Sequence, residues 1–280
     1  MIGFFDSGSG GLTIMQGCRK VMPDASFVYL GDHANAPYGH RDNQAIVDLT
    51  KTGINFLFEQ GCTLVVLACN TAAAVALRTL QQEWLPQAWP DRNILGVLVP
   101  MVEAVSGVAW ANEQPSQESA KDVRNIILFA TRKTVESGAY AEELAKRAPN
   151  LTLIQKACPG LVDAIEGGAG QLPLAGLVKG YVDEACEDLG GGRFDTAVLG
   201  CTHFPMVEHL FRQALGAGVP LYSQPDVVAE ALVRYIAAHP EYDIATGGST
   251  RLFSTSPQKD IMGWDKGQQG KQVTFEQIRL

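Results

Sequence analysis

The amino-acid sequence predicts an α/β protein that consists of two pseudo-symmetric parallel-sheet domains. Apolar runs rich in β-branched residues alternate with helical patterns along most of the 280 residues. Such alternation is typical of parallel sheets joined by right-handed crossovers. Two of the apolar runs resemble each other, residues 63–71 (TLVVLACNT) and residues 195–203 (DTAVLGCTH). Their likeness indicates that the chain has two related halves.

The first half begins with an apolar strand, a glycine-rich turn at residues 6–11 (DSGSGG) and a helix. Glycines at such a turn let the backbone approach a ligand closely, although a tight connection has the same pattern. The expected elements are strands at 1–5, 26–30, 63–67 and 94–98 and helices at 12–22, 42–60 and 71–83, with an irregular loop at 33–41. The helix at 42–60 follows from apolar residues at helical spacing that end at a glycine.

The second half starts after a crossing near residue 99, a helix at 101–110 and a polar insertion at 111–124. Apolar runs then predict strands at 126–130, 151–155 and 196–199, separated by helices at 135–147 and 173–189 and a short helical segment that ends at 165–168. After residue 205 we expect a helix, a strand at 221–222, a helix at 226–238 and strand-like pieces at 251–254 and 272–275. The predicted domains are residues 1–98 with 208–280, and residues 99–207.

The composition restricts the classes of partner. A net charge of −8 without a cluster of Lys or Arg argues against a nucleic-acid surface. A small anionic substrate remains compatible, because local amide dipoles can hold an anion. No segment has the pattern of a membrane span or a secretory signal, so we expect no membrane contact and a cytoplasmic location. The six cysteines include no CxxC pair, which leaves a disulfide framework or a structural zinc site with little support.

Two cysteines are candidates for chemistry because each follows an apolar strand and precedes a helix start. Ligands of α/β proteins bind beyond the carboxyl ends of the strands. The positive end of the following helix is expected to lower the thiol pKa and favour the thiolate. Cys69 and Cys201 occupy such positions, one in each half. The remaining cysteines, Cys18, Cys62, Cys158 and Cys186, are interpreted as structural.

Three ionisable residues near these positions each have two interpretations. Asp6 is either a helix N-cap or a site carboxylate, and His203 either caps a helix or titrates beside Cys201. Glu166 is either a solvated carboxylate at a helix end or a pocket acid that tunes a neighbour. The other histidines, which are His33, His40, His209 and His239, are expected at the surface.

With these residues in place, the chain resembles glutamate racemase, a member of the cofactor-independent aspartate/glutamate racemase superfamily. The resemblance rests on five segments that occur in the family's order between residues 2 and 205. They are residues 5–12 (FDSGSGGL), residues 31–39 (GD followed by PYG), residues 68–72 (ACNTA), residues 131–140 (TRKTVESGAY) and residues 199–205 (LGCTHFP). Together they are highly specific.

The resemblance implies an active site in the cleft between two α/β domains, with the second inserted into the first, and a homodimer. It implies interconversion of L- and D-glutamate without pyridoxal phosphate or another cofactor and without a metal, supplying D-glutamate for peptidoglycan. Cys69 and Cys201 would be the acid/base thiols, assisted by Asp6, His203 and Glu166. The residues that would hold the substrate are Asp6, Ser7, Tyr38, Gly39, Asn70, Thr71, Thr131, Thr134, Thr202 and His203.

The implied chemistry agrees with the cysteine pattern, because racemisation removes a proton from one face of Cα and returns one to the other. The alternatives are a racemase of aspartate or another amino acid, a non-catalytic binding protein on the same fold and, more distantly, a zinc or phosphate site. The chain departs from the family's usual pattern at Ser9, His33, the 111–124 insertion and residues 222–225 (YSQP).

Overall fold

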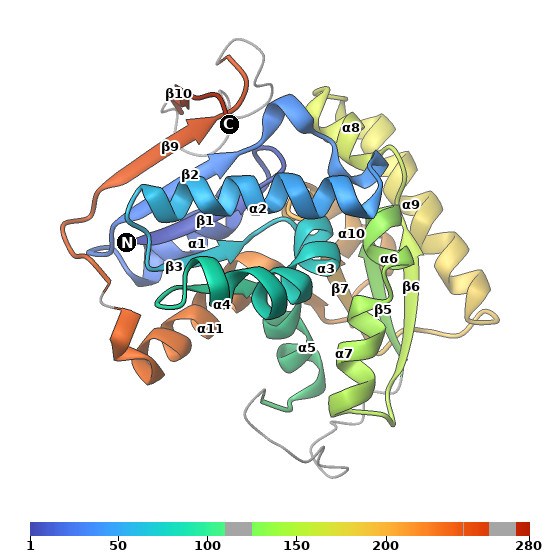
Figure 1. Ribbon diagram of the computed structural model, residues 1–280. Coiled ribbons are helices and arrows are strands. Elements are labelled where there is room, and N and C mark those ends of the chain that lie inside the picture. The colour runs from blue at the N-terminus through green and yellow to red at the C-terminus, as the bar shows by residue number, and fades with distance from the viewer. Residues whose placement is uncertain (110–124, 243, 258–272) are drawn as a thin grey trace.

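The computed structural model describes residues 1–109, 125–242, 244–257 and 273–280. It confirms the α/β class, since these residues form two parallel sheets with helices around them (Figure 1). The predicted insertion at 111–124 lies outside the described residues. No helix of the described ranges is long and apolar enough to cross a membrane.

The larger sheet has six strands in the order β10-β9-β2-β1-β3-β4, with every pairing parallel. Its strands are β1 (Ile2–Asp6), β2 (Phe27–Gly31), β3 (Leu64–Leu67), β4 (Asn93–Gly96), β9 (Thr250–Ser254) and β10 (Glu276–Gln277). Strands β1, β2 and β3 are buried along their whole length, which explains their continuous apolar pattern. Near the C-terminus, strand β10 is Glu276–Gln277, whereas the sequence led us to expect a strand-like piece at 272–275.

The smaller sheet has four strands in the order β6-β5-β7-β8, again parallel. These strands are β5 (Asn125–Ala130), β6 (Thr152–Ala157), β7 (Thr196–Gly200) and β8 (Leu221–Tyr222). Strand β8 pairs with β7, so this sheet extends past residue 207, where we expected the second domain to end. The division into domains itself stays a prediction.

Helices cover both faces of each sheet (Figure 1). Around the six-stranded sheet lie α1 (Leu12–Val21), α2 (Asn43–Glu59), α3 (Asn70–Thr79), α4 (Leu85–Ala88) and α11 (Gln224–Ala238), with a π-helical segment η3 (Leu80–Trp84) between α3 and α4. Around the four-stranded sheet lie α5 (Leu98–Ser106), α6 (Arg132–Glu136), α7 (Ala139–Arg147), α8 (Leu161–Glu166), α9 (Gln171–Asp188) and α10 (Glu208–Leu215). The short 3-10 segments are η1 (His33–Asn35), η2 (Tyr38–His40), η4 (Phe204–Val207) and η5 (Pro240–Tyr242).

Two expected elements have different bounds. The helix expected at 135–147 is two helices, α6 and α7, because Gly138 has a φ of 69° and breaks the helical path between them. The strand expected at 94–98 ends at Gly96, and residues 98–100 already belong to α5. Pro100 is compatible with this assignment because it lies in the first turn of the helix, where no N–H is needed.

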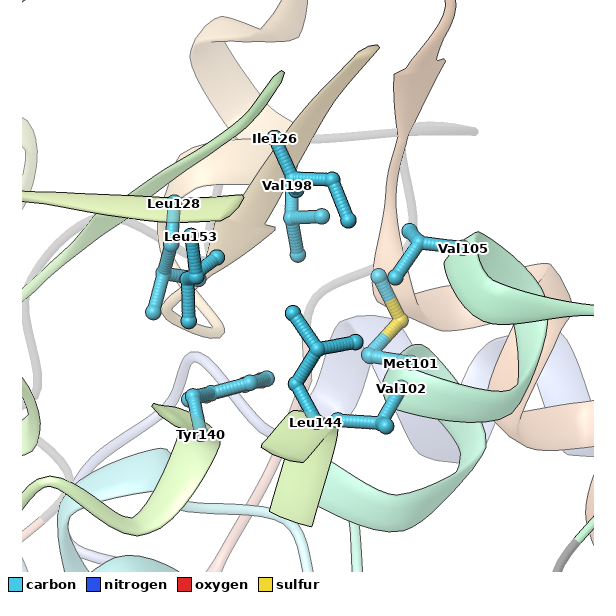
Figure 2. A pocket seen from close by; sticks show the side chains of 9 residues that line it. All are labelled: Met101, Val102, Val105, Ile126, Leu128, Tyr140, Leu144, Leu153 and Val198. Atoms are coloured by element: carbon cyan, nitrogen blue, oxygen red, sulfur yellow. The ribbon is translucent and has the colours of Figure 1, made fainter. Parts of the chain in front are cut away.

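The two faces of the four-stranded sheet belong to different apolar cores. The side chains of β5 point alternately to the two faces of the sheet. Ile126 and Leu128 lie in the core that is shared with the larger sheet. Ile127 and Phe129 lie in the core beneath α9 and α10. A small apolar cavity of about 10 Å³ lies in the shared core, where α5 and α7 meet β5, β6 and β7 (Figure 2). This space holds no more than about one water molecule, so it is too small for a small-molecule ligand.

Candidate active site

Cys69 lies two residues beyond strand β3 and is the N-cap of α3. Its sulfur accepts the backbone N–H of Ala72 at 3.5 Å and lies 3.5 Å from the hydroxyl of Ser7. Burial, and next the charge of Asp6, raise the pKa of Cys69 to about 12. The lowered pKa expected from the helix N-terminus is therefore wrong for this thiol, because one N–H contact does not replace the lost hydration.

Asp6 ends strand β1 and is fully buried. One carboxylate oxygen accepts the backbone N–H of Gly8 at 2.8 Å, and the other accepts the hydroxyl of Thr202 at 3.2 Å. Burial raises the pKa of Asp6, while the charge of His203 opposes this rise. The N-cap interpretation is wrong, since Gly11 is the N-cap of α1. Asp6 instead closes the turn that follows β1 and contacts the smaller sheet's loop.

Cys201 directly follows strand β7 and is 5% exposed. Two positions after Cys201, Nε2 of His203 lies 2.8 Å from Oε1 of Glu166. Burial alone would lower the pKa of His203, but Cys201 and Glu166 raise it to about 10. His203 makes no capping hydrogen bond from its side chain. The titrating interpretation of His203 is thus the one that the geometry favours.

Glu166 is the last residue of α8 and is part of this site rather than a purely solvated helix end. Burial raises the pKa of its carboxyl, but the hydrogen bond and charge of His203 outweigh burial and lower it overall. A methyl group placed on Gly8 would lie 3.2 Å from Oε1 of Glu166. Glu166, at the end of α8 beside the four-stranded sheet, therefore lies against the glycine-rich turn that follows β1 of the six-stranded sheet.

The glycine-rich turn allows the two halves of the site to touch. A Cβ on Gly10 would lie 2.4 Å from the hydroxyl oxygen of Thr202 and 2.7 Å from the ring of His203. Real Cβ atoms do not approach other atoms so closely. The glycine at position 10 is therefore required by close contact with the second sheet, independently of any ligand.

Three threonine hydroxyls meet at the boundary between α3 and α6. The oxygen of Thr71 lies 3.0 Å from that of Thr131 and 3.4 Å from that of Thr134, and the last two are 3.0 Å apart. Thr134 is fully buried, whereas Thr131 is half-buried. Thr131 can thus offer its hydroxyl to a ligand, and Thr134 fixes the orientation of the other two.

Two further residues expected in the site have different surroundings. Tyr38 is 1% exposed, and its hydroxyl donates to the carboxylate of Asp32 at 2.7 Å. The hydrogen of the Tyr38 hydroxyl is therefore engaged with Asp32, and its oxygen remains an acceptor. Gly39 lies beside Thr131, whose Cβ would be 4.0 Å from a methyl group on Gly39.

Asn70, the first residue of α3, is 3% exposed and has partners that the sequence did not indicate. Its amide forms hydrogen bonds with Gln224 and with the hydroxyl of Tyr140. Gln224 is 154 positions away. The only signal in the sequence was that residues 222–225 depart from the racemase pattern, which gave no contact.

His33 is not a surface residue as expected. Its Nε2 lies 2.8 Å from the hydroxyl of Ser9, and its Nδ1 lies 3.0 Å from the hydroxyl of Ser254 in β9. Burial lowers the pKa of His33. Two departures from the racemase pattern, Ser9 and His33, are thus direct partners. His40 and His209 are exposed as predicted, and His239 is half-buried.

All six cysteines are free thiols. Among the described residues, no group of three or more His, Cys, Asp or Glu side chains has an arrangement that could hold a metal ion. The side chains at the site are thus two thiols, a carboxylate beside the first thiol, an imidazole–carboxylate pair beside the second, and hydroxyl and amide donors between them.

Comparisons with known proteins identify the family of this chain. The model of the Asp/Glu/Hydantoin racemase family matches residues 13–232. The chain is 45% identical over 259 residues to the glutamate racemase of Phenylobacterium zucineum, covering 91% of each chain. It is 41% identical over 277 residues to that of Jannaschia sp., covering 99% of each. A crystal structure of a glutamate racemase isoform from Bacillus anthracis superposes with a TM-score of 0.81 at 26% identity, covering 100% of this chain and 97% of the other.

The fold and the family model place this protein among the amino-acid racemases and related enzymes of the α/β class. The chain belongs to the Asp/Glu/Hydantoin racemase family.

Proposed function

We propose that this protein is an isomerase that interconverts L- and D-glutamate without a cofactor, with Cys69 and Cys201 as the two acid/base groups. The observation that carries the proposal is the contact between the two sheets at the thiols. Asp6, whose charge acts on Cys69, accepts the hydroxyl of Thr202, the neighbour of Cys201. This contact links the surroundings of Cys69 to the neighbour of Cys201, and it supports a site with one thiol from each sheet, as a reaction on both faces of one carbon requires.

The two thiols have different surroundings, which suits their opposite roles. With a pKa of about 12, Cys69 holds its proton at neutral pH and is ready to act as an acid. His203, two residues after Cys201, is an imidazolium at neutral pH because its pKa is about 10. From the resemblance to the racemases, we assign the proton abstraction from L-glutamate to Cys201 and the return of a proton on the opposite face to Cys69.

The reverse direction requires Cys69 to lose its proton. The ammonium group of a bound amino acid brings a positive charge into a buried site, and a nearby positive charge lowers a thiol pKa. Asp6 is the carboxylate whose charge acts on Cys69. It can accept the ammonium group of the substrate or take the proton that leaves Cys69. Its raised pKa makes a transient proton on Asp6 less costly.

Proton removal from Cα leaves a carbanion-like state whose charge must be stabilised. Without an electron-sink cofactor, donors aimed at the α-carboxylate are the available means. The hydroxyls of Ser7, Thr71 and Thr131 and the amide of Asn70 are assigned this role, together with the backbone at Gly39, while Thr202 borders the substrate and donates its hydroxyl to Asp6. Thr134 acts through Thr71 and Thr131.

The resemblance to glutamate racemases also suggests a biological role, a location and an oligomeric state. We propose that the product D-glutamate supplies peptidoglycan synthesis, that the enzyme is cytoplasmic and that it forms a homodimer. The six free thiols suit a reducing compartment.

The test is exchange of the Cα hydrogen with solvent deuterium, followed by NMR and circular dichroism without pyridoxal phosphate. L- and D-glutamate are compared with aspartate for the wild type, Cys69→Ser and Cys201→Ser, with Cys186→Ser as a control thiol outside the site. We expect exchange and racemisation of glutamate by the wild type and the control, and loss of racemisation in both site variants. Exchange of the Cα hydrogen of aspartate alone would show that aspartate, not glutamate, is the substrate. Exchange with neither amino acid would contradict the racemase proposal and favour a binding protein on the same fold.

A further inference from the structure

Asn70 and Gln224 form a reciprocal pair of amides. The Nδ2 group of Asn70 donates to Oε1 of Gln224 at 2.8 Å, and the Nε2 group of Gln224 donates to Oδ1 of Asn70 at 2.9 Å. Gln224 is the first residue of α11 and is fully buried. Two hydrogen bonds in opposite directions fix the two amides relative to each other, because rotating one of them alone by 180° would set donor against donor and acceptor against acceptor.

A third group fixes the same amide from the other sheet. The hydroxyl of Tyr140, in α7, donates to Oδ1 of Asn70 at 2.9 Å. Tyr140 is 3% exposed, and its pKa is raised by burial and by the charge of Cys201. Tyr140 therefore contacts the amide that follows the first thiol, and the charge of the second thiol acts on its hydroxyl. The amide of Asn70 thus joins α3, α7 and α11.

Counting hydrogen-bonding groups shows what remains available on Asn70. An asparagine side chain offers two N–H donors and an oxygen with two lone pairs. Tyr140 and Gln224 occupy both lone pairs, and Gln224 takes one N–H. The second N–H has no recorded partner within the described residues. Asn70 follows Cys69 directly at the start of α3, so this N–H belongs to the region of the first thiol.

We propose that Gln224, together with Tyr140, is a positioning residue that orients the Asn70 amide, so that its remaining N–H donates to the carboxylate of the substrate. This inference rests on the proposed racemase function. A donor whose orientation is fixed in advance loses little conformational entropy when the substrate binds. Gln224 touches Asn70 rather than the reacting atoms, so its effect is expected mainly on substrate affinity.

The first test compares Gln224→Met with the wild type. Methionine has a similar size and no strong hydrogen-bonding group, so the Asn70 amide keeps only its bond to Tyr140. We expect the KM for both enantiomers to rise roughly tenfold, with a smaller change in kcat. Gln155→Met is the matched control, since Gln155 lies in β6 and its Oε1 is buried without a partner. An unchanged KM in Gln224→Met would overturn the proposal.

Tyr140→Phe provides a second variant in case Gln224→Met fails to fold. It removes only the hydroxyl that donates to Asn70, and the ring still fills the same space. We expect a rise in KM of several-fold. A wild-type KM in this variant, with normal thermal unfolding, would contradict the role of the Asn70 amide. If the wild type itself does not racemise glutamate, the proposed function fails first, and the two failures are distinguished.

A pH-dependent rescue separates positioning from simple loss of stability. In Gln224→Glu the protonated carboxyl offers one donor and one acceptor and can replace the amide, whereas the carboxylate cannot donate to Oδ1 of Asn70. Burial disfavours the charged form, so the rescue extends to higher pH than for an exposed glutamate. We compare the KM of Gln224→Glu with the wild-type KM measured at the same pH. We expect the ratio of the two KM values to be near one at low pH and to rise with pH. A ratio that does not change with pH would overturn the proposal.

Discussion

The hydroxyl of Thr202 donates to the carboxylate of Asp6 at 3.2 Å and so joins the carboxyl ends of strands from two different sheets. Asp6 ends β1, and Thr202 follows β7 by two residues. Both side chains are buried. The polar ends of the two sheets therefore form one continuous network, and changes in one sheet are expected to alter groups on the other.

The pair of His203 and Glu166 predicts a specific dependence of stability on pH. The pKa of His203 in the folded state, about 10, lies above its ordinary value of about 6.5, so its contribution is complete below about pH 6.5 and is lost as the pH rises through about 10. The pKa of Glu166 is lowered, so its contribution is present above about pH 4.3 and is lost as the pH falls. The pair stabilises the fold most between these limits.

Glu166→Gln is expected to lower the pKa of His203 and to flatten the fall in unfolding free energy above pH 6.5. Denaturant unfolding at a series of pH values measures this. The matched control is Glu241→Gln, which breaks the exposed pair of Glu241 with His239, 2.8 Å apart. Exposed ion pairs contribute little to stability. Parallel pH curves for the wild type and Glu166→Gln would contradict the assigned pairing.

Gly10→Ala is expected to destabilise the protein by about 1–3 kcal/mol and to abolish racemisation. The added methyl group would have to displace Thr202 and His203, which lie 2.4 Å and 2.7 Å from it. Gly176→Ala is the control, because this exposed helical position in α9 has no atom within 4 Å of the new Cβ. It is expected to stabilise by about 0.5–1 kcal/mol. Equal effects of the two substitutions on unfolding would refute the close contact.

Tyr38→Phe is expected to reduce stability without changing the KM for glutamate. The Tyr38 hydroxyl donates to the carboxylate of Asp32, and a hydrogen bond to a charged group contributes about 1.5–3 kcal/mol. Thr131→Val removes a hydroxyl that is partly exposed at the site and is expected to raise KM, and because this hydroxyl also caps α6 we expect a loss of about 0.5–2 kcal/mol of stability. Steady-state kinetics and thermal unfolding of both variants provide the comparison. A large KM effect of Tyr38→Phe would restore a direct role for this hydroxyl.

Asp6→Asn is expected to lower the pKa of Cys69 below about 12, because it removes the nearby negative charge, although burial still holds the pKa above its ordinary value. Alkylation of Cys69 by iodoacetamide, followed by mass spectrometry across a pH series, reports the thiolate fraction. Cys62 is an internal control, since burial raises its pKa to about 12 with no contribution from Asp6. Acceleration at both thiols alike would indicate general unfolding rather than the loss of one charge.

The arrangement of strands and helices could be predicted because it depends on local patterns. The buried strands β1, β3 and β7 are continuous apolar runs, and the residues that follow them are polar and small. A parallel sheet places the ends of such strands along one edge. This is why Asp6, Cys69 and Cys201 could be selected from the sequence as candidates.

Local patterns failed where a long-range contact decides the outcome. The pairing of β8 with β7 is set by two residues, too short a run to assign to a sheet. The pKa of Cys69 depends on the depth of burial and on Asp6, 63 positions earlier, and both outweigh the helix N-terminus that the sequence indicated.

The sequence by itself determined the fold class, the family and the two thiols, since these follow from short contiguous patterns. Only the tertiary structure decided which side chains act on those thiols. The pairing of His203 with Glu166 and the amide pair of Asn70 with Gln224 join residues far apart in the chain, whereas the hydroxyl of Tyr38 donates to Asp32 within the loop that follows β2. These contacts exist only in the folded chain, and the bonds of Thr202 to Asp6 and of Tyr140 to Asn70 exist only after the two sheets have packed together, because a hydrogen bond requires its partners to lie within about 3 Å of each other.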